Sequence, residues 1–394
     1  MNMPVYLNAM GLVCALGDGV DECADTLFRS DAAHGLVRST RYSPGRELAL
    51  GEVTTPLSAL AEHPLALRSR NNALLQRAWA QIQPQADALR DRVGAARLAV
   101  IVGTSTSGIG EAERAITRRN AQGWPSDFHY GQQEIGAPSR FLATLAGSRG
   151  PAWTVSTACS SGAKALASGA RLLRAGIVDA VIAGGADSLC GFTLAGFSAL
   201  EAVSPEPCLP FSRQRSGINI GEGAALFLMT REPGPVRLAG WGESSDAHHM
   251  SAPDPKGEGA IVAVLQSISR AGLKARDIDY VNLHGTATAH NDAMEAQVVT
   301  HTLGSEVAAS STKPMTGHAL GASGAIEAAI SWITLAENPR HLLPPHWYDG
   351  DYDPALPRID LVQPGRSASA PLRHVLSHSF AFGGSNAVLL LGAG

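Results

Sequence analysis

Short apolar segments rich in β-branched residues recur along the chain and alternate with longer alanine-rich segments of helical periodicity. Five segments have the pattern of buried strands: Leu98–Val102, Trp153–Val155, Val178–Ala183, Ile278–Leu283 and Ala387–Leu391. Three have the pattern of helices: Gly162–Ala175, Ala260–Ala271 and Ala322–Ala336. Gly176 and Gly272 stand where the C-caps of two of these helices are expected. Strands that alternate with helices of this length predict an α/β fold of parallel sheets covered by helices.

Two pairs of distant segments resemble each other and occur in the same order. The first pair reads IVGTSTSGIGEAERA from Ile101 and LHGTATAHNDAMEA from Leu283, each with an acid in its helix, Glu113 and Glu295. The second pair reads TVSTACSSGAKALASGA and ASSTKPMTGHALGASGAIEAA, each a strand, a Ser-Thr turn and a small-residue helix. The shared order favours an internal duplication whose halves meet near Thr230–Trp241, and chance similarity in an Ala/Gly-rich chain is the alternative. In a doubled unit of this kind, functional residues gather at corresponding carboxyl ends of strands.

The composition agrees with a compact, loop-rich α/β protein. Of the 394 residues, 45% are hydrophobic and 17% are charged, and 42 are Gly and 23 are Pro. The formal net charge of -4 gives no global reason to expect a nucleic acid as a partner. No apolar run approaches the roughly 18 residues that a membrane span needs. The first residues also lack the pattern of a signal peptide.

The cysteines are few and scattered. There are five, without a CxxC pair or a Cys/His metal spacing: Cys14, Cys23, Cys159, Cys190 and Cys208. This pattern argues against a disulfide framework or a structural zinc site. We therefore expect a protein of the reducing cytoplasm.

Cys159 is the candidate nucleophile. It lies in V-S-T-A-C-S-S-G-A-K-A-L, directly after a strand signal and at the start of a helix. The unpaired N–H groups and the macrodipole at a helix N-terminus favour a thiolate, and the N–H of Cys159 can serve as an oxyanion donor. A buried core cysteine is an equally good interpretation of this position alone. The other four cysteines lack this setting, and we expect them to be core or surface residues.

Two histidines and a lysine lie in the repeated loops. His284 ends a strand in Y-V-N-L-H-G-T-A-T, and His318 precedes a helix in S-S-T-K-P-M-T-G-H-A-L-G-A-S-G. Two imidazole N–H groups can polarise a thioester carbonyl and stabilise an enolate. Lys313 can add positive charge or orient a histidine, and a solvated loop lysine is the alternative.

A pair of glycines near the C-terminus predicts a tight turn between two strands, in H-S-F-A-F-G-G-S-N-A-V-L-L-L. Phe380 and Phe382 flank this turn at one side. Such aromatics are usually core residues. One of them can instead gate a hydrophobic channel, because Gly383 and Gly384 permit a backbone swing.

Taken in order, these motifs resemble the elongating β-ketoacyl-acyl carrier protein synthases of fatty acid and polyketide synthesis, over nearly the whole chain. The matching segments are T-A-C-S-S, G-G-A-D-S at 184–188, P-F-S-R-Q-R-S-G-I-N-I-G-E-G-A-A at 210–225, S-S-D-A-H-H-M at 244–250, H-G-T-A-T at 284–288, T-K-P-M-T-G-H-A-L-G-A-S-G at 312–324 and F-A-F-G-G-S-N at 380–386. The resemblance implies a thiolase-like fold, a duplicated five-layer αβαβα sandwich that is normally dimeric. We place the N-terminal half, with the nucleophile, at residues 1–236 and the C-terminal half at residues 237–394.

The resemblance also implies roles for individual residues. Cys159 matches the acylated nucleophile, and His284 and His318 match the pair at which a malonyl thioester loses carbon dioxide. The supporting residues that match are Lys313 beside the histidines, Glu327 as a buried structural acid, Phe382 as the gating aromatic and second oxyanion donor, and Thr286 and Thr288 as ligands of the phosphopantetheine arm. No metal or diffusible cofactor is implied, since the substrates arrive on that arm. A structural cation near Glu327 is an expectation by analogy only.

Related classes fit the residues less well. Thiolases use a second active-site cysteine, and no cysteine follows Cys208. Chain-initiating condensing enzymes use Cys–His–Asn, where this chain has a second histidine, His318. A non-catalytic chain-length-factor-like partner of another ketosynthase remains the alternative function, although such proteins lack the nucleophile that Cys159 supplies.

Some features depart from the housekeeping pattern. Asn291 stands where the family usually has Gly, Ala381 stands between the two phenylalanines where Gly is common, and the join near 231–237 is short. These departures favour a specialised polyene or polyketide pathway over primary fatty acid synthesis. The segments Gly108–Ile109 and Phe192–Phe197 are expected to contribute to the acyl tunnel.

We expect acyl carrier protein as a partner, and a homodimer or a heterodimer with a chain-length-factor-like subunit. Carrier proteins in these systems are acidic, so a basic rim at the tunnel mouth is expected. The candidate docking residues are Arg68, Arg70, Arg118, Arg119 and Arg213.

Overall fold

One continuous mixed sheet carries the fold in the computed structural model, which describes residues 3–31 and 33–394. Its strand order is β12-β11-β10-β13-β14-β9-β1-β8-β7-β5-β6, with β2 paired to β1, and β3 and β4 form a separate hairpin. The strands are β1 (Tyr6–Cys14), β2 (Gly17–Asp18), β3 (Val37–Ser39), β4 (Leu48–Leu50), β5 (Leu98–Gly103), β6 (Ala152–Val155), β7 (Ala180–Asp187), β8 (Gly223–Thr230), β9 (Val236–Ser245), β10 (Tyr280–Asn282), β11 (Ala308–Ser310), β12 (Asp360–Leu361), β13 (His374–Ala381) and β14 (Ser385–Ala393). The helices are α1 (Val20–Leu27), α2 (Arg70–Val93), α3 (Ile109–Arg118), α4 (Ala137–Leu145), α5 (Ser161–Arg174), α6 (Gly191–Ala199), α7 (Glu258–Ala271), α8 (Ala289–Thr302), α9 (Lys313–Thr316) and α10 (Ser323–Ala336).

The two ends of the sheet repeat one pairing pattern. In the N-terminal part β5 pairs in parallel with β6 and β7, and β7 pairs antiparallel with β8. In the C-terminal part β10 pairs in parallel with β11 and β13, and β13 pairs antiparallel with β14. A short antiparallel contact between β1 and β9 joins the two parts into one sheet. The repeated pattern agrees with the duplication expected from the sequence, whereas the exact division into halves stays a prediction.

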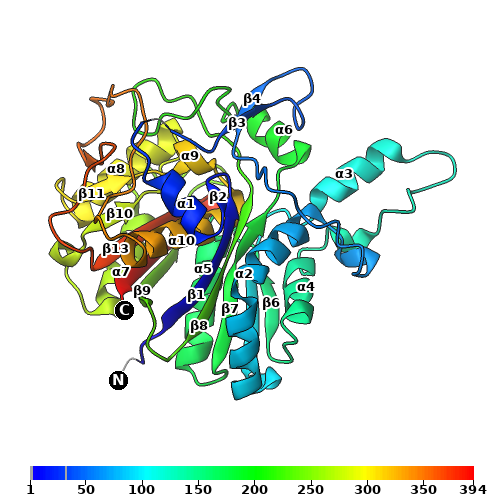
Figure 1. Cartoon of the computed structure of the whole chain (residues 1–394). Coiled ribbons are helices and arrows are strands. Elements are labelled where there is room, and N and C mark those ends of the chain that lie inside the picture. The colour runs from blue at the N-terminus through cyan, green and yellow to red at the C-terminus, as the bar shows by residue number, and fades with distance from the viewer. Residues whose placement is uncertain (1–2, 32) are drawn as a thin grey trace.

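The five expected layers are present, and three buried clusters fill the interfaces between them, the central cluster filling both sides of the layer of α5 and α10. Along β5, Leu98, Val100 and Val102 pack into the cluster that holds α2 and α4, while Ala99 and Ile101 face the cluster that holds α5 and α10. This alternation is the period of a strand with both faces covered. A third cluster lies between the C-terminal strands and α7 and α8. Figure 1 shows α2 and α4 on one flank, α7 and α8 on the other, and α5 and α10 between the two parts of the sheet.

The two central helices cross closely because small residues line their contact. A Cβ on Gly162 of α5 would lie 2.8 Å from the backbone nitrogen of Ala325 on α10, and a Cβ on Gly324 would lie 2.9 Å from the backbone nitrogen of Ala163. Such distances exclude a larger residue at either glycine. The close crossing brings the N-terminal ends of α5 and α10 together, and with them the turns that carry Cys159 and His318.

The predicted elements are confirmed, with ends that differ by a few residues. The strand signals became β5, β6, β7, β10 and β14, and the helix signals became α5, α7 and α10. Gly176 and Gly272 follow α5 and α7 with φ of +67° and +71°, the left-handed conformation that glycine adopts at a helix end. The sequence patterns did not predict α2, the longest helix, or the apolar strand β8, whose type a continuous apolar run does not reveal.

No helix among residues 3–31 and 33–394 is both long and apolar enough to span a lipid bilayer.

Candidate active site

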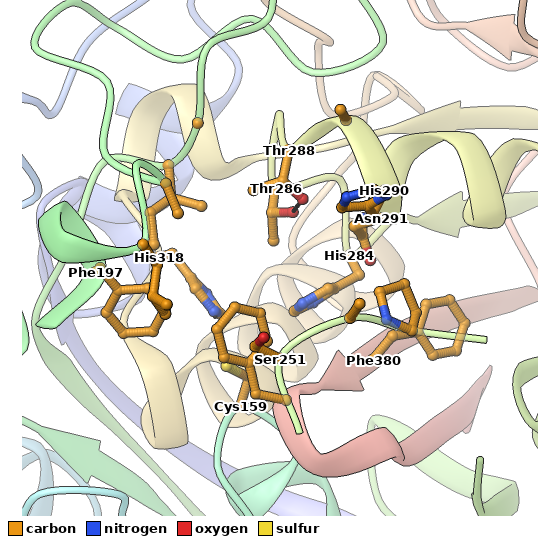
Figure 2. A pocket seen from close by; sticks show the side chains of 18 of the residues that line it. Cys159, Phe197, Ser251, His284, Thr286, Thr288, His290, Asn291, His318 and Phe380 are labelled. Carbon is orange, nitrogen blue, oxygen red and sulfur yellow. Dashed lines mark hydrogen bonds between the residues drawn. The ribbon is translucent and has the colours of Figure 1, made fainter. Parts of the chain in front are cut away.

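Cys159 and His318 meet where the two central helices begin. The Sγ of Cys159 lies 2.9 Å from Nε2 of His318, and the two side chains are 5% and 2% exposed. His284 enters from the end of β10, and its ring centre lies 5.2 Å from that of His318, edge to face. In Figure 2 the nitrogens of both rings point into the space beside the Cys159 sulfur. The structure therefore brings together the three residues that the sequence singled out from separate loops.

A tight turn presents the Cys159 side chain to this space. Ala158 has φ of +50°, a left-handed conformation that is uncommon for a residue with a Cβ. The hydroxyl of Ser161 holds the turn, since it accepts from the Thr157 N–H (2.9 Å) and donates to the Ala158 carbonyl (2.6 Å). The turn is thus fixed by its own side chains, as a site that must hold a nucleophile in one place requires.

A chain of polar contacts runs from His318 to a buried ion pair. Nδ1 of His318 lies 3.2 Å from the Ser323 hydroxyl, which donates to Oε1 of Glu327 (3.2 Å), and Lys313 Nζ donates to the same oxygen. Because the Ser323 proton points to Glu327, its oxygen accepts from Nδ1–H of His318. That tautomer leaves the Nε2 lone pair facing the Cys159 thiol, so His318 can accept the thiol proton.

Burial dominates the electrostatics of the cysteine. It raises the pKa of Cys159 to about 12, while the Lys313 charge and the N–H of Phe382 lower it and the Asp187 carboxylate raises it. The thiol is therefore the resting form. This corrects the expectation of a favoured thiolate, which considered the helix N-terminus and not the desolvation of a fully buried sulfur.

The same burial keeps both histidines neutral. Desolvation, and after it the charge of Lys313, holds the pKa of His284 and of His318 well below the ordinary value. Burial also raises the pKa of Glu327 to about 7, against the opposing effect of Lys313. A neutral imidazole has one ring nitrogen that donates and one that accepts, which suits a group that must receive a thiol proton and later donate to a developing oxyanion.

A second buried carboxylate holds the His284 loop. Glu295 accepts from the backbone N–H groups of His284 and Gly285, both at 2.7 Å, and its Oε1 also lies 3.0 Å from Nδ1 of His378. The side-chain Nδ1 of His284 has no hydrogen-bond partner among the described residues. The loop is thus anchored through its backbone, and the imidazole is left free toward the cavity. Asn291 adds to this anchor by donating to Asp292 (3.2 Å) and Glu295 (3.3 Å).

The three residues line a cavity of about 560 Å³ that opens to the surface. Thr286 and Thr288 lie at its wall with their hydroxyls 3.0 Å apart, the buried Asn291 also lines it, and the exposed His249 and His290 lie further out. Figure 2 shows Thr286 and Thr288 beyond the two imidazoles, seen from Cys159. The cavity joins a deep thiol to the exterior, which suits a long, narrow substrate arm.

Phe382 closes one side of the cavity. Its ring lies 5.5 Å from that of Phe197, and its backbone N–H faces the Cys159 sulfur and lowers the pKa of the thiol. The tight turn predicted at Gly383 and Gly384 is present, with φ of +80° and +72° between β13 and β14. The segments Gly108–Ile109 and Phe192–Phe197 were expected to contribute to the acyl tunnel. Of their residues, Phe197 alone lines this cavity, and Phe192 is 63% exposed.

The arginines proposed for docking lie in different settings. Arg70 pairs with Glu222, whose side chain is fully buried, so its guanidinium is engaged inside the protein and does not suit docking. Arg68 donates to the carbonyls of His63 and Ala61 and is half-buried. Arg213 is exposed and pairs with Asp351, and Arg118 pairs with Asp127. Arg119 lies over the ring of Trp124.

Other buried residues support the site without having been singled out from the sequence. Asp187, 1% exposed, accepts from Thr104, Ser105 and Thr106 of the loop after β5 and from Gly321 N–H (2.6 Å), close to His318. It lies in the G-G-A-D-S segment, and its position at the end of a strand, β7, was the available signal. Ser323 and Lys164 gave no signal of their own, because their partners are far away in the sequence.

Comparison with known proteins gives the site a family context. The sequence profile described as Beta-ketoacyl synthase, N-terminal domain, matches residues 2–233, and the one described as Beta-ketoacyl synthase, C-terminal domain, matches residues 236–346. The chain is 38% identical over 280 residues to 3-oxoacyl-(acyl-carrier-protein) synthase 2 of Rhizobium meliloti (strain 1021), a match that covers 64% of this chain and 65% of that protein. It is 31% identical to Nodulation protein E of Rhizobium meliloti, with 99% of both chains covered.

One solved structure is similar over the entire chain. It is described as the ketosynthase ApeO in complex with its chain length factor ApeC, from Xenorhabdus doucetiae. The matched chain has a TM-score of 0.93 and 45% sequence identity, and the match covers 100% of this chain and 98% of that chain.

Proposed function

The chain belongs to the β-ketoacyl synthase family, and on that premise we propose that it catalyses decarboxylative Claisen condensation between a Cys159-bound acyl group and malonyl-acyl carrier protein. The product is a β-ketoacyl chain longer by two carbons, still attached to the carrier. The observation that carries the proposal is the convergence of Cys159, His318 and His284 in one cavity, with Sγ and Nε2 2.9 Å apart.

In the first half-reaction Cys159 takes the acyl group. The thiol proton moves to Nε2 of His318, and the sulfur attacks the carbonyl carbon of the acyl thioester. The resulting oxyanion is held by the N–H groups of Cys159 and Phe382. When the intermediate collapses, the carbon–sulfur bond to the phosphopantetheine arm breaks, and the leaving thiolate takes the proton from His318. The resting thiol with its pKa near 12 requires such a neighbouring base.

In the second half-reaction the two histidines stabilise the enolate that acts as the nucleophile. The malonyl thioester loses carbon dioxide, and its two bonding electrons form an enolate whose oxygen accepts hydrogen bonds from the rings of His284 and His318. Once the sulfur is acylated, it no longer carries a proton that can be donated to Nε2 of His318. To donate from Nε2, His318 must take up one proton there from solvent and release its Nδ1 proton, and the contact through Ser323 to Glu327, whose pKa is raised to about 7, offers a route for the released proton.

The carbon–carbon bond then forms at the thioester. The enolate carbon attacks the acyl carbon on Cys159, the oxyanion again lies between the N–H groups of Cys159 and Phe382, and the Cys159 thiolate leaves. One proton taken up from solvent through His318 restores the thiol. Thioester activation supplies the acidity of the α-carbon, so we propose that the reaction uses no metal or diffusible cofactor. Thr286 and Thr288 are proposed to hold the phosphopantetheine arm at the cavity wall.

For partners, we propose acyl carrier protein as substrate carrier and a chain-length-factor-like subunit in a heterodimer. The name of the Rhizobium relative and the complex formed by ApeO support these two partners. The same similarity favours a specialised polyketide-type pathway over primary fatty acid synthesis. Arg213, whose side chain is 62% exposed, is the docking candidate that we retain. We propose a cytoplasmic location for the protein. A non-catalytic chain-length-factor role is disfavoured because nucleophile, base and second histidine are all present and in contact.

The test is condensation by the purified protein in its native assembly. Incubation with acyl-carrier protein and malonyl-carrier protein should yield the β-ketoacyl-carrier protein, detected by mass spectrometry of the carrier. Cys159→Ala should abolish the product. Cys208→Ala is the matched control, since Cys208 is also buried with a pKa raised to about 12 and lies outside the cavity. Undiminished product with Cys159→Ala would overturn the catalytic assignment.

A further inference from the structure

Behind the cysteine, a lysine and two serines form a chain of short polar contacts that the condensation mechanism does not use. Nζ of Lys164, on α5, donates to the Ser385 hydroxyl at 2.6 Å. The Ser385 hydroxyl lies 3.0 Å from that of Ser160, and the Ser160 hydroxyl lies 2.8 Å from the Thr157 carbonyl. Lys164 and Ser385 are separated by 221 positions in the sequence, so the fold alone creates this contact.

The chemistry of these groups gives the chain one direction. An ammonium group has only donors, so Ser385 must accept from Lys164. The Thr157 carbonyl has only lone pairs, so Ser160 must donate to it. The remaining contact is then fixed, because the free proton is on Ser385 and the free acceptor is on Ser160. The hydrogen bonds therefore run from Lys164 through Ser385 and Ser160 to Thr157.

This chain joins the two backbone turns that hold the oxyanion donors. Thr157 and Ser160 belong to the turn that presents Cys159, and Ser385 directly follows the turn of Phe382, Gly383 and Gly384. The N–H of Phe382 faces the Cys159 sulfur. The distance between the two N–H donors thus depends on how the two turns are tied together.

The Phe382 turn needs such a tie because its backbone is permissive. Gly383 and Gly384 both have positive φ, and Gly383 is exposed. Two backbone hydrogen bonds also hold the Phe382 turn. The Gly383 N–H donates to the Met250 carbonyl (2.8 Å), and the Asp246 N–H donates to the Gly384 carbonyl (2.9 Å). The Ser385 hydroxyl is the side-chain contact that ties this segment to the cysteine turn. A charged donor makes a stronger hydrogen bond than a neutral one, which suits Lys164 to this place.

We propose that Lys164 and Ser385 are positioning residues that hold the Phe382 turn against the Cys159 turn and so set the geometry of the oxyanion site for acyl transfer. The proposal rests on the proposed function, since it assigns Lys164 and Ser385 to one step of that reaction. Neither residue lines the cavity or touches substrate. Their effect should fall on the steps that use the Cys159 and Phe382 N–H groups and not on decarboxylation at the histidines.

The test separates those steps in the native assembly. Acyl loading is followed by intact mass after mixing with acyl-carrier protein, and decarboxylation of malonyl-carrier protein is followed separately without an acyl donor. Lys164→Met and Ser385→Ala should each slow loading about tenfold through kcat with little change in KM, because misplacement of a donor weakens transition-state stabilisation. Decarboxylation should change less than about twofold.

Conservative and control variants make the result specific. Ser385→Thr keeps the hydroxyl and should restore loading to within about twofold of wild type. Ser168→Ala is the matched control, because the Ser168 hydroxyl bonds the Lys164 carbonyl on the same helix and is not part of the chain.

Three results would overturn the proposal: loading by Lys164→Met and Ser385→Ala at the wild-type rate, an equal loss in loading and decarboxylation, or failure of Ser385→Thr to restore loading. Failure of the wild-type protein itself to load would instead contradict the proposed function.

Discussion

The loops that follow β5 and β10 have related sequences, G-T-S-T at 103–106 and G-T-A-T at 285–288, and each leaves the carboxyl end of a buried parallel strand. A fully buried carboxylate holds each of them. Asp187 accepts hydrogen bonds from the backbone N–H groups of Ser105 and Thr106 and from the hydroxyls of Thr104, Ser105 and Thr106 in the first loop. Glu295 binds the second through the backbone N–H groups of His284 and Gly285 alone.

The difference lies in where the hydroxyls point. In the first loop the three hydroxyls all donate to Asp187, so this loop has a structural role. In the second loop Thr286 and Thr288 contact each other at the cavity wall and are available to a substrate. We therefore expect the first of these related loops to act as support and the second, following the proposed function, to act as a binding surface. The acids of the repeated helices diverged as well, since Glu113 instead accepts from the backbone of Gly191.

The largest expected effect tests the shared support role. Asp187→Ala and Glu295→Ala should each lower the free energy of unfolding by about 3 to 5 kcal/mol, because several buried donors lose their acceptor at once. Urea unfolding followed by circular dichroism measures the change. Glu306→Ala, at an exposed loop position, should stay within about 0.5 kcal/mol. A loss below about 1 kcal/mol at either carboxylate would break the parallel between the loops.

A smaller effect is expected from one hydroxyl of the supporting loop. Thr104→Ala removes a group that donates to Asp187 at 2.5 Å and accepts from Ser107 N–H at 3.0 Å. The free energy of unfolding should fall by about 1 to 3 kcal/mol, and KM for acyl-carrier protein should be unchanged in the remaining folded enzyme. A rise in KM without a loss of stability would assign this loop to binding and contradict the comparison.

The binding loop should show the opposite behaviour. The double variant Thr286→Ala, Thr288→Ala should raise KM for acyl-carrier protein about tenfold, equivalent to roughly 1.4 kcal/mol, because the arm loses two hydrogen-bond partners. Its unfolding free energy should change by less than about 1 kcal/mol. Steady-state kinetics with the carrier-bound substrate decides between the two roles. A loss of stability like that of Thr104→Ala, at unchanged KM, would make both loops structural.

The smallest expected effect concerns charge. Because burial raises the pKa of Cys159 to about 12, alkylation by iodoacetamide should accelerate about tenfold per pH unit from pH 7 to pH 10. The Asp187 carboxylate disfavours the thiolate and so raises this pKa. Asp187→Asn should therefore shift the profile to lower pH, by less than one unit, while Glu295→Gln leaves it in place. A wild-type rate that levels off below pH 8 would contradict the raised pKa.

The sequence predicted the convergence of the site for a definite physical reason. Cys159, His284 and His318 each follow a strand signal, and the carboxyl ends of parallel strands share one edge of a sheet. The alternation of strands and helices predicted sheets covered by helices, and the resemblance to a known family implied the five layers. Features that depend on pattern within one segment were therefore predictable.

Features that depend on distant packing were not. The pKa of Cys159 reflects how completely residues from distant segments, among them Leu194, Ile220 and Leu320, enclose the cysteine, which no local pattern encodes. The contact from Asp187 to Gly321 joins residues 134 positions apart. Arg70 was expected at the docking surface for a similar reason, because its pairing with Glu222 depends on a partner 152 positions away in the sequence.

The most direct test of the central claim, that Cys159 holds the electrophile while the histidines make the nucleophile, is intact-mass spectrometry of the protein. After incubation with acyl-carrier protein the mass should rise by one acyl group, located at Cys159 by peptide mapping, and malonyl-carrier protein should then discharge it. His284→Ala should load and fail to discharge. An acyl group that persists in Cys159→Ala, or that malonyl-carrier protein discharges equally well from His284→Ala, would contradict the account.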